Sequence, residues 1–193
     1  MVKVISILVA CTTALGCAES TIVDSRAIAF RDDCASSLND YAKTQRTVLA
    51  SGWKSVESDK HPELEAVMSF AQKLDPNLIA KSEFQSYVKD LDGIAIYLVL
   101  AHVPFEEKFL NGCYVYGFDD SKIDRSSVIS VWLGADPTET VNHPGLIQQN
   151  KWIGPTKFPH LATVRVGAIP DGSSVADETG FSGAIWAATS VSN

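Results

Sequence analysis

Apolar residues return at helical spacing through much of the first half of the chain. Over residues 32–51 they recur every three or four positions, and Gly52 follows as a residue that takes the left-handed cap conformation without strain. Residues 62–74 show the same stripe behind Pro62, whose fixed φ suits the first helical position. The spacing predicts helices over these two segments and a third, short helix over residues 82–90.

Strand-like patterns dominate from residue 94 onwards. Residues 94–101 are apolar on both faces, which predicts a central strand covered on both sides. Further strands are predicted at 27–30, 113–118, 128–133, 162–169 and 181–191. Asn111 and Gly112 tolerate positive φ and predict a hairpin turn, whereas residues 136–155 are predicted to form an irregular crossing segment. This order predicts an α+β fold, with N-terminal helices packed on a largely antiparallel sheet formed mainly by the C-terminal half.

The N-terminal segment has the pattern of an export signal. Lys3 is followed by an uncharged, largely apolar stretch over residues 4–15 and then by small residues. A basic start, a short apolar run and small residues, in that order, are typical of secretory signal peptides. The run is too short to span a bilayer, which takes about 20 apolar residues. We therefore predict a signal peptide over residues 1–18 and a single α+β domain over residues 19–193.

Two ends of this signal are compatible with its sequence. Ala14-Leu15-Gly16-Cys17 resembles the lipobox of bacterial lipoproteins, although Ala14 stands where that pattern prefers Leu. The resemblance implies cleavage before Cys17, lipidation of its thiol and attachment to a membrane surface. Ordinary cleavage after Ala18 is the alternative. Either end predicts an exported protein, located in the periplasm, anchored at the outer membrane or released from the cell.

Cysteine positions follow from this assignment. Cys34 and Cys113 are the two cysteines beyond the predicted signal. Because exported chains meet an oxidising compartment, these two thiols are expected to form a disulfide. A bridge over a loop of this length is worth up to about 4 kcal/mol in the chain-entropy description.

Composition and charge limit the classes of partner. The chain has 193 residues, of which 46% are hydrophobic, so it can bury a core without the help of metal ions. Its net charge is −7, which argues against a nucleic acid partner, because phosphate binding needs clustered cations. The same charge leaves a lipid anchor as the expected route to a membrane. The four histidines are dispersed and lack ligand spacing, and no cofactor motif occurs, so neither a metal site nor a cofactor is predicted.

A glycine-flanked serine is the candidate nucleophile. Residues 180–184, Gly-Phe-Ser-Gly-Ala, resemble the loop around the nucleophile of trypsin-like proteases. The resemblance implies a small secreted serine hydrolase, with Ser182 as nucleophile and His102 as base. Phe181 stands where that family has Asp before its serine. The alternative is that the glycines only ease the entry of the chain into a strand.

Aromatic residues supply the candidates for binding. Trp152 lies in a polar segment bounded by glycine and proline, and Tyr114 and Tyr116 alternate along a predicted strand. Exposed aromatic rings beside amides suit a protein, peptide or glycan partner. The alternative for Trp152 is a lid on the core, since large aromatic residues are mostly buried. The first hypothesis is therefore an exported binding or structural module, and the secreted hydrolase is the second.

Overall fold

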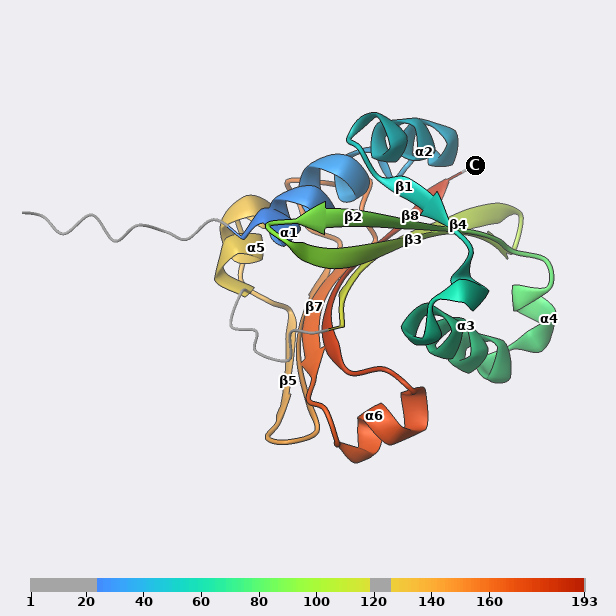
Figure 1. The fold of residues 1–193 in the computed structure, drawn as a ribbon. Helices are drawn as coiled ribbons and strands as arrows, with labels where there is room; N and C mark the ends of the chain where they lie inside the picture. Colours follow the sequence, from blue (N-terminus) through green and yellow to red (C-terminus); the bar gives the residue numbers. More distant parts are fainter. Residues whose placement is uncertain (1–23, 119–125, 193) are drawn as a thin grey trace, which may run out of the picture.

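Eight antiparallel strands form one sheet in the part of the chain that the structure, a computed structural model, describes, namely residues 24–118 and 126–192 (Figure 1). The strands are β1 (Lys54–Val56), β2 (Glu83–Leu91), β3 (Ile94–Phe105), β4 (Lys108–Gly117), β5 (Glu139–His143), β6 (Ile147–Ile153), β7 (Thr163–Ile169) and β8 (Gly183–Ser192). Their order across the sheet is β1-β2-β3-β4-β8-β7-β6-β5. The first four and the last four strands are thus two antiparallel meanders, which join where β4 pairs with β8.

Helical segments cover both faces of this sheet (Figure 1). They are α1 (Ser25–Ala29), η1 (Phe30–Cys34), η2 (Ala35–Ser37), α2 (Tyr41–Ala50), η3 (Ser58–Lys60), α3 (Pro62–Leu74), α4 (Pro76–Ile79), α5 (Ser126–Leu133) and α6 (Ser174–Thr179). The first helices and α5 pack on one face, and α3 and α6 pack on the other. The molecule has the predicted α+β character, but α5 and α6 lie in the C-terminal half and β1 and β2 in the N-terminal half, so helices and strands are less segregated than predicted.

Alternation along the strands gives the sheet two hydrophobic faces. Leu98, Val115 and Trp186 are in register on neighbouring strands and fully buried on the face that α1 and α5 cover. Tyr97 and Tyr116, also in register, belong to the face that α3 covers. Because successive residues of a strand point to opposite faces, the same strands build both cores. The predicted strands at 94–101, 113–118, 162–169 and 181–191 are confirmed within β3, β4, β7 and β8.

The predicted helix over residues 62–74 is confirmed as α3, but the predicted helix over residues 32–51 is interrupted. Its front half lies in η1, which is π-helical and therefore wider than an α-helix, and in the tighter 3₁₀ turn η2, which ends at Ser37. Asp40 then starts α2 by accepting a hydrogen bond from the Lys43 backbone N–H at 2.9 Å. Gly52 follows the C-cap of α2 with φ +88, as its predicted role in ending the helix requires.

Three other element predictions are wrong. Residues 27–30 are helical within α1 and η1, and residues 128–133 belong to helix α5, where strands were predicted. Residues 82–90 lie mostly in β2, where a helix was predicted, because β2 pairs with β3 along its whole length. Short apolar runs fit the helix and strand periods about equally well, so the pattern alone could not separate them.

The predictions for two connections are also wrong. The β3–β4 hairpin turns at Glu106, which has φ +54, whereas Asn111 and Gly112 lie inside β4. Residues 136–155 are not irregular, since β5 and β6 form an antiparallel hairpin within them. Pairing with long neighbouring strands therefore decides where these segments turn.

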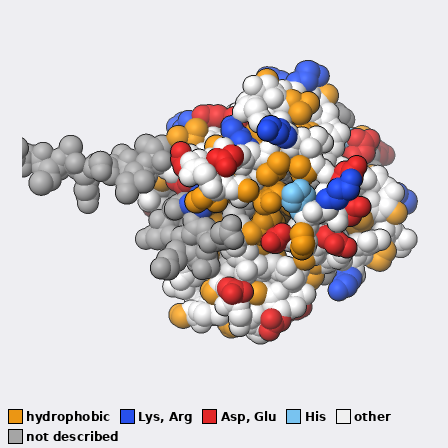
Figure 2. Space-filling view, viewed as in Figure 1, with side chains coloured by type: hydrophobic (Ala, Val, Ile, Leu, Met, Phe, Trp, Pro, Cys, Tyr) orange, Lys and Arg blue, Asp and Glu red, His pale blue; other side chains and the backbone are white. Residues whose placement is uncertain are grey.

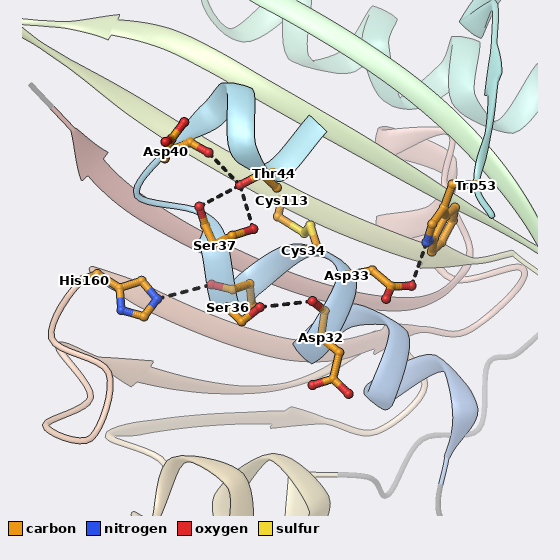
Figure 3. The surroundings of a disulfide bond; sticks show 11 residues. Asp32, Asp33, Cys34, Ser36, Ser37, Asp40, Thr44, Trp53, Cys113 and His160 are labelled. Atoms are coloured by element: carbon orange, nitrogen blue, oxygen red, sulfur yellow. Dashed lines mark hydrogen bonds between the residues drawn. A yellow bond between two sulfur atoms is a disulfide. The ribbon is translucent and has the colours of Figure 1, made fainter. Parts of the chain in front are cut away.

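The predicted disulfide is present and joins the first helices to the centre of the sheet (Figure 3). Cys34 of η1 and Cys113 of β4 are both fully buried, with their Cα atoms 6.1 Å apart. Beside them, the Asp33 carboxylate accepts a hydrogen bond from Trp53 Nε1 at 2.9 Å and pairs with Lys89 Nζ at 3.2 Å. η1 is thus fixed to β4 by a covalent bond and to β2 by an ion pair.

The predicted signal peptide, residues 1–18 with the lipidation candidate Cys17, lies outside the described residues and stays a prediction. In the ranges that the structure describes, no helix has both the length and the apolar content needed to cross a membrane.

Candidate functional site

The candidate serine and histidine lie at opposite ends of the sheet. His102 of β3 is in register with Asn111, and Asn111 is in register with Ser190 of β8. Ser182 comes just before β8, eight residues ahead of Ser190. At about 3.3 Å per residue, this separation is about 26 Å along the strand. Ser182 is therefore out of hydrogen-bond reach of His102. His102 cannot act as the general base for Ser182 in this arrangement, which counts against the hydrolase hypothesis.

His102 instead takes part in a stacked aromatic arrangement. Its ring stacks on Tyr41 at 4.8 Å and on Phe109 at 4.1 Å between centroids. Its Nδ1 lies 2.7 Å from Oδ1 of Asn111. Because the Asn111 amide donates to the Leu38 carbonyl, its Oδ1 is left to accept, and His102 Nδ1 donates. Both faces of the imidazole and one of its nitrogens are thus engaged, by Tyr41 of α2 and by Phe109 and Asn111 of β4.

Ser182 lies where the chain enters β8. Gly180 ends α6 with φ +66 and Gly183 begins β8 with φ +117, both in the region that favours glycine. A Cβ at Gly183 would collide with the backbone oxygen of Gly117. Gly183 therefore allows β8 to approach β4 closely, and Gly180 allows the end of α6 to approach Ala66 of α3, as the alternative interpretation of these glycines expects.

Trp152, a candidate binding residue, is part of the core. Its side chain is 1% exposed, and its Nε1 donates to the Ala135 carbonyl at 3.0 Å. It packs among the buried residues of the face that α1 and α5 cover. Trp152 consequently offers no exposed ring to a ligand, because burying its large apolar surface stabilises the fold.

Tyr114 and Tyr116 belong to the opposite face of the sheet, toward α3. Tyr116 is 6% exposed, and burial raises the pKa of its phenol. Tyr114 is half-buried with its ring over Gly112; burial raises its pKa, and the Arg165 guanidinium opposes that rise. Of the two, Tyr116 contacts further aromatic rings.

Five rings around Tyr116 form a contiguous group, which we call the aromatic cluster. Its members are His61, Tyr97, Tyr116, Phe118 and Phe181. Ring centroids lie 5.2 Å apart for His61–Tyr97 and Tyr97–Phe118, 5.7 Å for Tyr116–Phe118, and 5.5 Å for Tyr116–Phe181 and Phe118–Phe181. Most of these pairs meet edge-on or tilted, and such pairs contribute about 0.5–1.5 kcal/mol each beyond the burial of their area.

Segments far apart in the sequence position these rings. His61 is the residue before α3, Tyr97 lies in β3, and Phe118 follows β4. Phe181 lies in the short link between α6 and β8. The pairing of Tyr97 with Tyr116 sets these two residues side by side on neighbouring strands. Residues of α3 and α6 pack against the same face of the sheet and complete the surroundings of the cluster.

The aromatic cluster is partly open to solvent. Tyr116 and Phe181 are each 6% exposed, whereas His61, Tyr97 and Phe118 are half-buried. In Figure 2 the surface between the sheet and α3 is hydrophobic and carries one histidine. Aromatic rings offer apolar faces, and imidazole and phenol groups add polar tips. The surface can therefore contact a ligand that combines apolar patches with hydrogen-bonding groups.

Tyr116 is the one member of this cluster that the sequence identified as a binding candidate. The other four are single aromatic residues in unrelated elements, and no spacing links position 61 to position 181. The sequence pointed to Tyr116 because Tyr114 and Tyr116 are two residues apart in a predicted strand, which places both side chains on one face.

Among the described residues, no group of three or more His, Cys, Asp or Glu side chains is arranged to hold a metal ion. The chain was also compared with protein-family models, curated proteins and solved structures, and none of them matches it.

Proposed function

We propose that the chain is an exported binding module whose ligand contacts the aromatic cluster. The observation that carries this proposal is the grouping of five rings, three of them half-buried, on one face of an antiparallel sheet. Aromatic side chains give large contact areas at little cost in conformational entropy, which is why they are enriched in binding sites.

Export is supported by two independent features. The first eighteen residues have the pattern of a signal peptide, and the chain contains a disulfide, which persists in oxidising compartments. The protein would then act in the periplasm, at the outer membrane or outside the cell. Mass spectrometry of the mature protein tests this proposal, since it reports the first residue and any acyl chain on Cys17. Recovery of the intact N-terminus, Met1 included, on protein from the cytosol would contradict it.

The chemistry of the cluster limits the ligand. Tyr97 and His61 carry hydrogen-bonding atoms at the edge of the group, and Phe118 adds apolar ring surface. A glycan or a peptide with aromatic side chains has the matching combination of apolar faces and polar edges. A nucleic acid is a poor match, because the net charge of −7 opposes a polyanion.

Nuclear magnetic resonance can test the site directly. The ¹⁵N-labelled protein is titrated with N-acetylglucosamine oligosaccharides and with an aromatic-rich peptide. We expect one of the two probes to shift the amide signals of residues in the aromatic cluster, and Tyr97→Ala to weaken that binding at least about tenfold, or 1.4 kcal/mol.

Phe105→Ala is the matched control for this titration. Phe105 is 50% exposed and lies on the same strand and the same face as Tyr97, but eight residues further along β3. Its removal should leave the affinity unchanged. Equal losses in both variants, or shifts confined to other parts of the sheet, would count against the aromatic cluster as the binding site.

A further inference from the structure

Strand β5 forms one edge of the sheet, and its outer side is open. It runs from Glu139 to His143 and stands last in the strand order, and Figure 1 shows it at the rim of the molecule. In the part of the chain that the structure describes, β5 pairs with β6 on one side and no strand occupies the other. Val141 is partly buried, and the other four residues of β5 are exposed. An edge strand of this kind presents backbone N–H and C=O groups that can pair with another strand.

The two edges of the sheet differ in how well they are protected against such pairing. β1, the other edge strand, is three residues long and begins with Lys54, and both short length and lysine discourage pairing with a second chain. β5 is five residues long, and its sequence Glu-Thr-Val-Asn-His contains no lysine, proline or glycine. β5 is therefore the edge with which a second strand can pair more readily.

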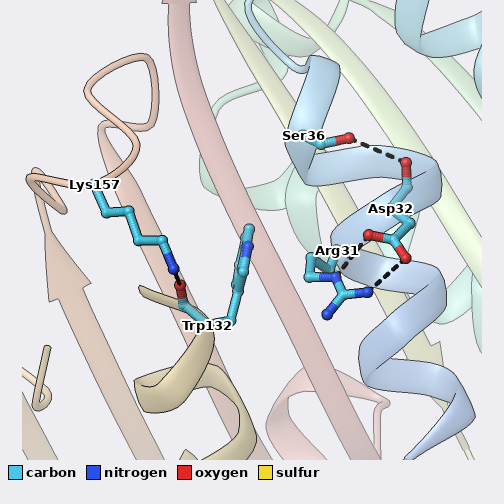
Figure 4. A network of polar contacts seen from close by, with 5 residues as sticks. All are labelled: Arg31, Asp32, Ser36, Trp132 and Lys157. Atoms are coloured by element: carbon cyan, nitrogen blue, oxygen red, sulfur yellow. Dashed lines mark hydrogen bonds and ion pairs between the residues drawn. The ribbon is translucent and has the colours of Figure 1, made fainter. Parts of the chain in front are cut away.

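The hairpin that carries β5 is held in place at its base. Lys157 Nζ, which follows β6, donates to the Trp132 carbonyl of α5 at 2.9 Å (Figure 4). Trp152 Nε1 of β6 donates at 3.0 Å to the carbonyl of Ala135, which lies between α5 and β5. Because these contacts fix the strand before any partner arrives, pairing needs little further ordering of the backbone.

The sequence of β5 is complementary to itself in the antiparallel direction. When two copies of β5 pair over their full length, Val141 of one copy meets Val141 of the other at a twofold axis, and Glu139 faces His143. On the opposite face of the sheet, Thr140 faces Asn142. Each cross-strand pair thus joins groups that attract: two β-branched apolar side chains, a carboxylate with an imidazole, and a hydroxyl with an amide.

Hydrogen bonds within the single chain leave acceptors for these pairs. Glu139 Oε2 accepts from Lys151 Nζ at 3.0 Å, so Oε1 of the same carboxylate can accept from an imidazole N–H. Thr140 Oγ1 donates to Asn150 Oδ1 at 2.7 Å, and the Thr140 oxygen keeps lone pairs for an amide N–H. The side chains that meet them from the second copy are exposed in the single chain. The pairs therefore add hydrogen bonds without breaking existing ones.

We propose that two copies of this chain associate through β5, which joins their sheets into one continuous antiparallel sheet around a twofold axis. One strand from each copy makes a small interface, so the dimer is weak, with a dissociation constant of about 10 µM or more. The net charge of −7 on each copy opposes association, and salt screens this repulsion. The contact uses β5 and does not depend on a ligand of the aromatic cluster.

Sedimentation equilibrium of the purified protein in about 150 mM salt tests the association. Glu139→Arg places a cation opposite His143, and His143→Glu places a carboxylate opposite Glu139. Each variant alone should therefore weaken the dimer at least about tenfold. A 1:1 mixture of the two variants should restore association, because the new arginine of one variant then faces the new glutamate of the other. A variant that simply folds poorly would not be rescued in this way.

Ser55→Glu is the matched control for these variants. It adds the same charge as His143→Glu, but at an exposed position of the opposite edge strand, β1, and it should leave the dimer unchanged. A parent protein that stays monomeric up to about 500 µM would overturn the proposal. Variants that associate as well as the parent, or a mixture that associates no better than either variant, would also overturn it.

Amide chemical shifts locate the contact without any substitution. Raising the concentration of the ¹⁵N-labelled protein should shift the signals of residues 139–143 and leave those of residues 54–56 in place. Concentration-dependent shifts confined to other elements would overturn pairing through β5. Because neither measurement includes a ligand, both leave binding at the aromatic cluster to its own titration.

Discussion

At the scale of single residues, Asn111 connects three parts of the fold. Its side chain is fully buried, accepts a hydrogen bond from His102 and donates to the Leu38 carbonyl at 2.9 Å and to Ser192 Oγ at 3.2 Å. A buried polar group of this kind stabilises the fold only while its partners are in place. The sequence favoured a turn at Asn111, because asparagine before glycine is common in hairpins, but the residue serves inside a strand as a hydrogen-bonding centre.

Replacing Asn111 should therefore be costly. Asn111→Ala is expected to lower the free energy of unfolding by about 2–3 kcal/mol, because it leaves the buried Leu38 carbonyl without its donor. Urea unfolding followed by circular dichroism measures the change. Asn142→Ala in the exposed edge strand β5 is the control and should cost less than about 0.5 kcal/mol. Similar values for the two variants would show that the hydrogen bonds of Asn111 contribute little.

At the scale of elements, the disulfide links the first helical segments to the sheet, all of whose strands follow them in the sequence. η1 and β4 are 79 residues apart in sequence at their cysteines, and both cysteines are fully buried. The ion pair between Asp33 and Lys89, at 3.2 Å, adds a contact from η1 to β2. The bridge therefore limits how far Cys34 and Cys113 can separate in the unfolded chain, and in the folded protein it holds η1 against β4.

Removal of this bridge should destabilise the protein without changing its fold. The double variant Cys34→Ala/Cys113→Ala is expected to lose about 4 kcal/mol of unfolding free energy, as estimated for closure of a long loop. Guanidinium unfolding under non-reducing conditions measures the loss. Cys17→Ala removes a cysteine outside the disulfide and should leave the free energy unchanged. A double variant as stable as the parent would contradict the stabilising role assigned to the bridge.

At the scale of the whole molecule, burial of tyrosines couples the fold to alkaline pH. The pKa values of Tyr41, Tyr87, Tyr114 and Tyr116 are all raised by burial, that of Tyr41 to about 12. Tyr41 and Tyr87 belong to the core between the first helices and the sheet, and Tyr114 and Tyr116 belong to the core between the sheet and α3. The ionised phenolate is thus disfavoured in both cores, because each core lacks the water that would solvate it.

Stability should consequently fall as the pH rises above about 10, where tyrosines of the unfolded chain ionise. In this range the folded protein binds more protons than the unfolded chain, so a rise in pH favours unfolding. The contribution of Tyr41 is complete below about pH 10 and is lost as the pH passes its folded value of about 12. Urea unfolding at stepped alkaline pH measures the decline, and tyrosinate absorbance follows ionisation. Ionisation of Tyr41, Tyr87, Tyr114 and Tyr116 near pH 10 in the intact fold would contradict their burial.

The sequence by itself determined the features that depend on local or compositional rules. The disulfide could be predicted because two cysteines remain beyond the predicted signal. Helix α3 could be predicted because Pro62 stands at its first position and a regular apolar stripe follows. The long apolar run at residues 94–101 determined a central strand, because a strand that is apolar on both sides must be covered on both sides. In each case the information lies within a short stretch of chain or in the composition.

Only the tertiary structure decided the remaining features. Residues 82–90 had helical spacing but lie mostly in β2, because nine backbone pairings with β3 outweigh a weak local preference. Residues 128–133 looked like a strand but form a helix whose inner side packs on the core. The aromatic cluster draws rings from positions 61 to 181, and the supposed base and nucleophile were separated by the register of β8. Contacts between distant segments set these outcomes, and their energies are not encoded in the periodicity of any single segment.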